Sequence, residues 1–188
     1  MLFPEPCIKE LIIGKCEFVS PADFNAKGLE KITFLKTAED MFPDIYFCED
    51  ENKAPNLKEI IIEDGNPVLG NDVVRDFAKD GIWYQTDCEA NETTLIFYPP
   101  AKENETFKVP SFIKILDSHC FHYNPHIKKI IMPKNFNGIV EEFAFSNCKN
   151  LETIVFQSYI EVKEDFFINC PNLKQVIAET PTPYKIEK

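Results

Sequence analysis

The residues of this chain that could hold a metal ion are concentrated in one short segment. All three histidines fall in the stretch HCFHYNPH, residues 119–126. Histidine and cysteine bind zinc when four such ligands converge on one point. Cys120 and Phe121, however, occupy positions in a sequence repeat, described below, at which the side chains are predicted to be buried. The sequence therefore predicts that the histidines leave this segment in different directions, and we expect no metal and no other cofactor.

Cysteine could also form disulfides. The chain has seven cysteines and no C-x-x-C pair: Cys7, Cys16, Cys48, Cys88, Cys120, Cys148 and Cys170. Small secreted scaffolds that rely on disulfides usually have an even number. Cys148 and Cys170 have the same position in two neighbouring repeats, so a disulfide between them stays an alternative if the repeats stack about 4.8 Å apart. We favour free thiols, most of them buried as small hydrophobic residues, and reducing or anaerobic conditions.

Acidic residues and catalytic motifs offer little further chemistry. The acidic clusters Glu49-Asp50-Glu51, Glu63-Asp64 and Asp72/Asp76/Asp80 lack the spacing of a calcium-binding loop, so we interpret most of them as solvated loop charges. Motifs for a serine nucleophile, a zinc protease, a P-loop and a dinucleotide site are absent from the sequence. We therefore expect no enzyme activity.

The charge and the apolar runs of the chain argue against a nucleic-acid-binding protein and a membrane-spanning protein. The net charge is −11, and residues 37–105 hold 17 acidic against 5 basic residues. A nucleic-acid partner is not expected, because it would need a basic surface. No apolar run approaches the roughly 20 residues of a membrane span, and no signal peptide is visible. The length of 188 residues suits one domain, residues 1–188.

These residues are positioned by a motif that repeats along the sequence. The motif apolar-x-x-apolar-x-apolar occurs at Ile8/Leu11/Ile13, Leu29/Ile32/Phe34, Leu57/Ile60/Ile62, Ile127/Ile130/Met132, Leu151/Ile154/Phe156 and Leu173/Val176/Ala178, and a variant at Asn104/Phe107/Val109. The last two positions alternate with period two, as in a strand with one buried face. A repeat of 20–30 residues predicts a stacked solenoid.

The chain between these strands has its own pattern, an apolar residue five positions before a Phe. It occurs at Val19/Phe24, Leu116/Phe121, Val140/Phe145, Val162/Phe167 and, less regularly, Phe42/Phe47. This interval predicts one or two short helical turns, and it predicts a buried stack of Phe121, Phe145 and Phe167. The segments NCKN and NCPN then lead into the next strand, where Asn suits left-handed backbone and local hydrogen bonds.

One repeat is enlarged by an insertion at about residues 63–103. Its segments DGIWY (80–84) and TLIFYPP (94–100) flank a polar stretch and are typical of a β-hairpin. We expect its aromatic residues to cover the flank of the solenoid: Trp83, Tyr84, Phe97 and Tyr98.

These motifs resemble a known family. The pattern V-x-x-I/V-x-x-x-A/F-F-x-N-C-x-N-L-x-x-I is similar to the leucine-rich repeat of the BspA-like (Treponema-type) class. The interruption DGIWY…TLIFYPP and the closing segment 173–188 also resemble that family. The resemblance implies an α/β fold: a right-handed β/α superhelix with a parallel sheet on one face. It also implies a non-enzymatic adhesion protein, secreted or at the surface of host-associated cells.

The candidate site lies on the predicted sheet. The fifth position of each strand motif points away from the core and is mostly a β-branched aliphatic residue: Ile12, Thr33, Ile61, Lys108, Ile131, Val155 and Ile177. The third position is polar throughout. An apolar stripe with a polar border is typical of a protein-contact face, but strand propensity alone also favours β-branched residues. Both interpretations stay open.

From the sheet face we predict a monomeric protein-recognition module, and the resemblance implies that it is an adhesion module that binds a host or matrix protein. The alternative is a structural spacer of a larger surface protein, with no ligand of its own.

Overall fold

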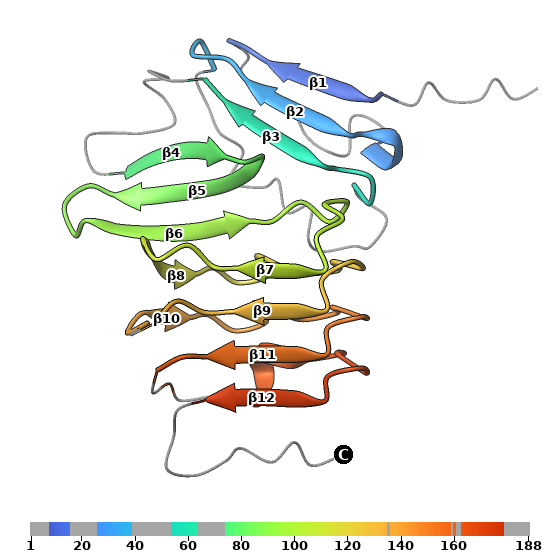
Figure 1. Ribbon diagram of the computed structural model, residues 1–188. Coiled ribbons are helices and arrows are strands. Elements are labelled where there is room, and N and C mark those ends of the chain that lie inside the picture. The colour runs from blue at the N-terminus through green and yellow to red at the C-terminus, as the bar shows by residue number, and fades with distance from the viewer. Residues whose placement is uncertain are drawn as a thin grey trace, which may run out of the picture. The chain divides into compact units, whose positions relative to one another are not determined.

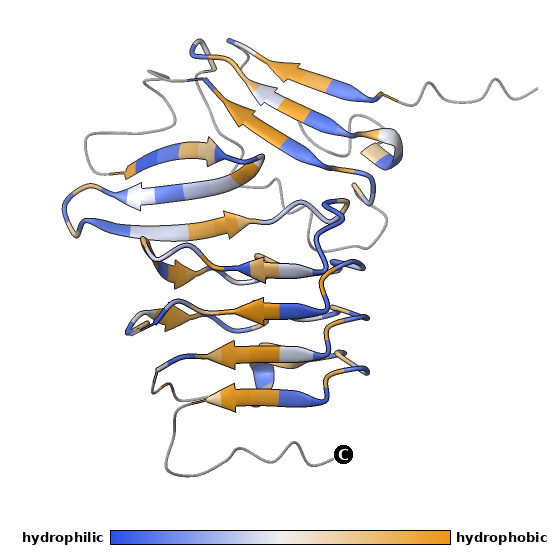
Figure 2. Ribbon diagram, viewed as in Figure 1, coloured by the Kyte–Doolittle hydropathy of each residue, from blue (hydrophilic) through white to orange (hydrophobic). Residues whose placement is uncertain are grey.

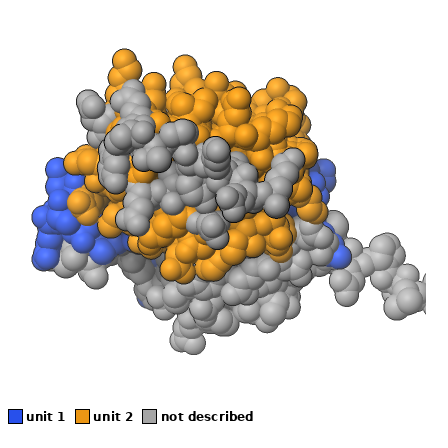
Figure 3. All heavy atoms as spheres, turned by 90° about the horizontal axis from the view of Figure 1, so that it is seen from below, with its two compact units in different colours: residues 1–91, 99–102 blue, residues 92–98, 103–188 orange. Residues whose placement is uncertain are grey.

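The computed structural model describes residues 8–15, 26–38, 54–63, 74–134, 136–158, 160 and 163–178. The chain forms two compact units, residues 1–91 with 99–102 and residues 92–98 with 103–188 (Figure 3). Both units contain the parallel strands of a β-solenoid. The expectation of one domain over residues 1–188 stays a prediction.

The first unit contains a sheet of three parallel strands in the order β1-β2-β3: β1 (Glu10–Ile13), β2 (Lys31–Phe34) and β3 (Glu59–Ile62). Each of these strands coincides with a repeat predicted from the sequence. Ile32 and Ile60, from the fourth motif position, are buried, and so are the leading residues Leu29 and Leu57. The apolar-x-x-apolar spacing therefore produces a buried face, as expected.

The first unit also contains an antiparallel hairpin, β4 (Val74–Lys79) and β5 (Ile82–Asp87). Strand β4 was not predicted. Its turn is formed by Asp80 and Gly81, which have φ angles of 53° and 72°. An Asp-Gly pair with two positive φ angles is a strong hairpin signal. The sequence analysis placed this pair at the start of a strand, although it is the turn between two strands.

The second unit contains a sheet of four parallel strands in the order β12-β11-β9-β7 (Figure 1). These strands are β7 (Thr106–Lys108), β9 (Lys129–Ile131), β11 (Thr153–Phe156) and β12 (Gln175–Ala178). Leu151 and Leu173 precede adjacent strands, and Thr153 is the register partner of Gln175. This pairing confirms the predicted register of the last two repeats.

The return side of the second unit contains β6 (Glu92–Phe97), β8 (Ile113–Leu116) and β10 (Ile139–Val140), with β8 parallel to both β6 and β10. Leu116 and Val140 were expected to begin helical turns, but they lie in β8 and β10 and are buried. Phe121 and Phe145 follow in turns.

Helix is almost absent from the residues that the structure describes. It is limited to two 3-10 helices, η2 (Ala26–Gly28) and η3 (Glu164–Phe167). The expectation of an α/β fold is therefore corrected to a β-solenoid. None of the helices found in the described ranges has the length and apolar character to cross a membrane.

Aromatic rings fill the centre of the second unit. Phe121 and Phe145 are fully buried and stacked, with ring centroids 5.7 Å apart, and Phe145 stacks on Phe167 at 5.7 Å. Phe107 extends the cluster, with its ring centroid 5.6 Å from that of Phe121. The predicted stack is confirmed, except that Phe167 is only half-buried.

The aromatic residues of the insertion are buried, as predicted: Trp83, Tyr84, Phe97 and Tyr98. In the first unit, the Trp83 ring centroid lies 6.0 Å from that of Phe34. In the second unit, the Tyr98 centroid lies 4.7 Å from that of Phe107. Strand β6 also pairs in parallel with β8.

Candidate binding face

The predicted site residues point outward in both units and form two rows. In the first unit Ile12, Thr33 and Ile61 are register partners on β1, β2 and β3. In the second unit the row comprises Lys108, Ile131, Val155 and Ile177, on β7, β9, β11 and β12. The register of the parallel strands thus brings residues far apart in sequence side by side, because equivalent motif positions align.

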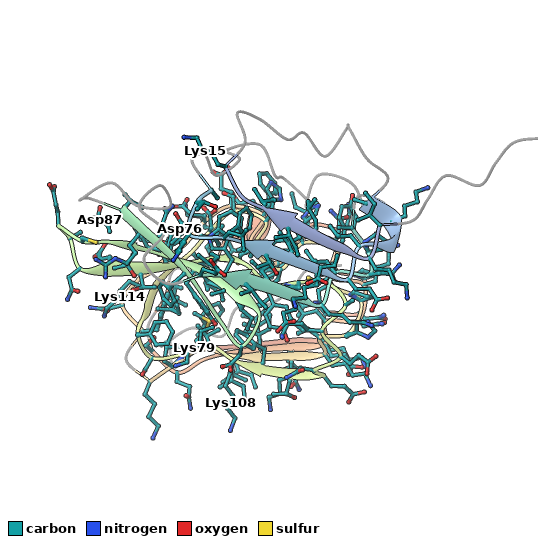
Figure 4. All side chains as sticks on the ribbon, turned by 90° about the horizontal axis from the view of Figure 1, so that it is seen from above. Lys15, Asp76, Lys79, Asp87, Lys108 and Lys114 are labelled. Atoms are coloured by element: carbon teal, nitrogen blue, oxygen red, sulfur yellow. The ribbon has the colours of Figure 1, made fainter. Side chains whose placement is uncertain are left out.

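Exposure differs along the two rows. Ile12 and Ile177 lie on strands at the end of their sheets and are 58% and 49% exposed. Ile61, Ile131 and Val155 are half-buried, as expected for β-branched side chains that pack against neighbours on both sides. Lys108 is exposed and projects outward from the sheet (Figure 4).

A polar border accompanies each row at the third motif position. In the first unit this border is Glu10, Lys31 and Glu59, and Lys31 Nζ lies 3.0 Å from Glu10 Oε1. In the second unit it is Thr106, Lys129, Thr153 and Gln175. Figure 2 shows this change along β9 and β12, each of which begins hydrophilic and continues hydrophobic.

Charges alternate in sign at the second motif position, a pattern that the sequence analysis missed. Along the chain this position is Lys9, Glu30, Lys58, Glu105, Lys128, Glu152 and Lys174. Glu30 Oε1 lies 3.2 Å from Lys9 Nζ and its Oε2 lies 3.0 Å from Lys58 Nζ. In the second unit Lys128 pairs with Glu105, and Lys174 Nζ lies 3.0 Å from Glu152 Oε2.

These ion pairs shift the ionisation of their members. The hydrogen bonds and charges of Lys58 and Lys9 lower the pKa of Glu30. The hydrogen bond and charge of Glu105 raise the pKa of Lys128. The groups are solvent-exposed, so each pair contributes little stability. The pattern would have been visible by comparing one motif position across all repeats.

Two of the histidines meet, contrary to the expectation that all three leave the segment in different directions. Nδ1 of His119 lies 3.1 Å from Nδ1 of His122, and Nδ2 of Asn147 lies 3.0 Å from Nε2 of His122. The backbone of His119 has a φ angle of 64°, and its ring stacks on Phe143, one coil away. Burial and the charge of His119 lower the pKa of His122 to about 4.

The described cysteines are free: Cys88, Cys120, Cys148 and Cys170. Cys7, Cys16 and Cys48 lie outside the described residues. The Cys148 thiol donates to the Phe121 carbonyl at 3.0 Å, and the Cys170 thiol donates to the Phe145 carbonyl at 2.9 Å. Each thiol thus bonds the preceding coil, and no bond links the two sulfurs. Burial raises the pKa of Cys170 to about 11 and also raises that of Cys148.

The asparagines after Phe145 and Phe167 also link coils. Asn147 and Asn169 both have a φ angle of 57°, which confirms the predicted left-handed backbone. Asn150 Nδ2 donates to the Pro125 carbonyl at 2.7 Å, and Asn172 Nδ2 donates to the Lys149 carbonyl at 2.8 Å. We had expected these side chains to bond within their own turn. They bond the preceding coil instead.

The acidic clusters show no ion site in the part of the chain that the structure describes, where no group of three or more His, Cys, Asp or Glu side chains could hold a metal. Asp76 accepts a hydrogen bond of 2.7 Å from Trp83 Nε1, and burial raises the pKa of Asp76. Glu63 Oε2 accepts a bond of 2.9 Å from the Lys36 amide. The segment 49–51, Asp64 and Asp72 lie outside the described residues.

Three solved structures are similar to this chain. A leucine-rich repeat protein from Eubacterium ventriosum shares 22% identity and a TM-score of 0.54, over 80% of this chain and 42% of that chain. The pneumococcal vaccine antigen PcpA shares 22% identity and a TM-score of 0.51, over 90% of this chain and 43% of its own. A leucine-rich cell surface protein from Faecalibacterium prausnitzii shares 15% identity and a TM-score of 0.50, over 90% of this chain and 41% of its own.

This chain thus spans less than half the length of each of these structures. Comparison with curated proteins found no match. Residues 96–186 match the family model described as a BspA type leucine rich repeat region. The matched residues contain the stacked Phe121, Phe145 and Phe167 and all four strands of the sheet that begins with β7. With six copies of this repeat, residues 96–186 are identified as a BspA type leucine rich repeat region, and the fold of the chain is similar to that of the leucine-rich repeat structures above.

Proposed function

We propose that this chain is a non-catalytic recognition module that binds a protein partner through the outward face of its sheets. The observation that carries the proposal is the aligned row of Ile131, Val155 and Ile177, beside a polar border. Apolar side chains that stay partly exposed in a regular row are typical of contact surfaces. Solenoids generally bind partners over such extended surfaces.

The family and the similar structures support a location and a role. Leucine-rich repeats are generally protein-interaction or surface modules. One similar structure is described as a cell surface protein and another as a vaccine antigen. We therefore propose a secreted or surface-exposed adhesion protein whose partner is a host or matrix protein. We further propose that its coils form one right-handed, monomeric array over residues 1–188.

A structural spacer is the second candidate. The half-burial of Ile61, Ile131 and Val155 favours it, because side chains that pack laterally along the ladder stabilise the sheet without any ligand. Under this alternative the sheet face has no partner.

Charge substitutions on the row separate the two candidates. We expect Ile131→Glu and Val155→Lys to abolish pull-down of a partner from host-cell or matrix extracts, because both residues lie at the centre of the row, where anchors contribute most. Ile139→Glu is the matched control, since Ile139 is 53% exposed but lies on β10, outside the face. Circular dichroism and unfolding midpoints confirm that each variant is folded.

The outcomes differ clearly. Loss of the partner in the two face variants, with retention in the Ile139→Glu variant, supports recognition. The spacer predicts that no protein is captured, or that the same proteins are captured by all variants. Unfolding of both face variants would show that the row is part of the core, and recognition through it would then be rejected.

A further inference from the structure

The outward face of the second unit differs in charge from the rest of the chain. We define the unit 2 face by its eight outward strand residues: Thr106, Lys108, Lys129, Ile131, Thr153, Val155, Gln175 and Ile177. The face contains two lysines and no carboxylate, whereas the whole chain has a net charge of −11. The acidic excess of the chain lies in residues 37–105, and the remainder holds 14 acidic and 15 basic residues. The specific feature of the unit 2 face is therefore that its eight positions include lysines and apolar residues but no carboxylate.

The two lysines of the face are available to a partner. Within the described ranges, neither Lys108 nor Lys129 has an ion-pair partner. The carboxylates that directly precede β7 and β11 in sequence, Glu105 and Glu152, are already paired with Lys128 and Lys174 at the second motif position. The alternating ladder thus neutralises itself and leaves the charge of the unit 2 face uncompensated.

The lysines lie together at one end of the row. Lys108 is the register partner of Ile131, and Lys129 is the register partner of Thr106, so the two are diagonal neighbours on β7 and β9. The apolar row then continues over Val155 to Ile177 on β12. Strands lie about 4.8 Å apart, so the row spans roughly 14 Å, which is about the length of four extended residues.

We propose, on the basis of the function proposed above, that the unit 2 face binds an extended acidic and apolar segment of its protein partner. Asp or Glu of this segment lies against Lys108 and Lys129, and bulky apolar side chains two and four residues away lie over Val155 and Ile177. Alternate residues of an extended chain point to the same side, which gives the spacing of two. Electrostatic complementarity then fixes the direction of the segment on the row.

A second copy of this chain does not fit the face as well. A two-fold dimer would bring identical patches together, and Lys108 and Lys129 would then face the same lysines. The strands have three or four residues and are about 10–13 Å long, so the face covers less than about 200 Å². A standard interface buries about 800 Å² per partner. A short segment satisfies both the charge and the size.

Selection from a random peptide library tests this proposal. The full chain and its Lys108→Glu/Lys129→Glu variant are used as separate targets, and the best peptides are then synthesised and their Kd measured by fluorescence anisotropy. We expect the wild-type chain to enrich Asp or Glu two or four residues from an aliphatic or aromatic residue. The double variant should bind these peptides at least about tenfold more weakly, and added salt should weaken wild-type binding.

A control variant changes the net charge equally. Lys134→Glu/Lys163→Glu replaces two exposed lysines that lie outside the strands of the unit 2 face, and it should bind the peptides like the wild type. If it loses binding equally, overall charge explains the effect and the proposal is overturned. Circular dichroism of both double variants checks that they remain folded.

The remaining outcomes distinguish this proposal from the proposed function. Selected peptides that lack acidic residues but are weakened by Ile131→Glu would overturn the partner class and leave recognition by the face intact. If Ile131→Glu weakens none of the selected peptides, both proposals fail. A solution dimer that Lys108→Glu/Lys129→Glu dissociates, measured by light scattering, would identify a second copy as the occupant and overturn the segment proposal.

Discussion

Gly138 lies directly against the backbone carbonyl of Lys114, so closely that a Cβ at Gly138 would be 1.7 Å from the Lys114 oxygen. This contact precedes the pairing of β10 with β8, where Ile139 is the register partner of Ile115. A side chain at residue 138 would push the two strands apart. We expect Gly138→Ala to destabilise the protein by at least about 2–3 kcal/mol, as steric overlap with backbone does, measured by urea unfolding.

Gly14 provides the matched control for this substitution. A Cβ at Gly14 would meet only the side chains of Thr37 and Leu35, at 3.4 and 3.6 Å, so the change in unfolding free energy for Gly14→Ala should stay within about 1 kcal/mol. Equal effects of the two substitutions would contradict the close approach of β10 to β8.

Removing one ring from the Phe stack should have an effect that depends on its position. Phe145 is fully buried between Phe121 and Phe167, so Phe145→Ala should cost about 3–5 kcal/mol of unfolding free energy. Phe167→Ala should cost less, because Phe167 is only half-buried. An unfolding midpoint that does not move in the Phe145→Ala variant would refute the register of the coils.

The strands and the core could be predicted because their signals are local and repeated. The alternation of Ile130 in β9 with Met132 directly after it, and its recurrence at Ile154 and Phe156, determines which side faces the core. The constant position of Phe121 and Phe145 within their repeats likewise predicts that they stack. Repetition makes these inferences reliable, since an error in one coil is corrected by the next.

Other features depend on backbone geometry that the sequence pattern does not contain. His119 meets His122 because its backbone adopts a φ angle of 64°, which is uncommon for a residue other than glycine. The β-strands around Leu116 and Val140 were mistaken for helical turns because a spacing of five residues fits both. The outward row could be located from the sequence, but its exposure depends on which neighbours cover each side chain.

Thiol reactivity should reflect the burial of the cysteines. Titration of the denatured, unreduced protein should detect close to seven thiols, because the described cysteines are free. In the folded protein at pH 8, Cys88 should react rapidly, while Cys148 and Cys170 should be protected by burial and raised pKa values. The Cys88→Ser variant should lose one fast-reacting thiol. Recovery of a single thiol after denaturation would instead show three disulfides.

Stability should fall in mild acid because of His122. Its pKa is about 4 in the folded protein, owing first to burial and then to the charge of His119, against 6.5 for the ordinary side chain. Between these values the unfolded chain binds more protons than the folded one, so stability increases with pH in this window. The contribution of His122 is therefore complete above pH 6.5 and is lost as the pH falls toward 4. Between pH 7.5 and 5.0 the loss should be about 2 kcal/mol.

His122→Gln isolates this contribution, because Gln keeps a polar group near Asn147 but does not titrate. Urea unfolding at pH 7.5 and 5.0 should show a smaller pH dependence for His122→Gln than for the wild type, by about 2 kcal/mol. His126→Gln, a substitution outside the His119–His122 pair, should keep the wild-type pH dependence. Half-buried Asp76 and Asp117 have raised pKa values, which oppose the trend equally in all three proteins. If His122→Gln and the wild type lose the same stability in acid, the His122 side chain is not held neutral by its burial, and the geometry of the pair is wrong.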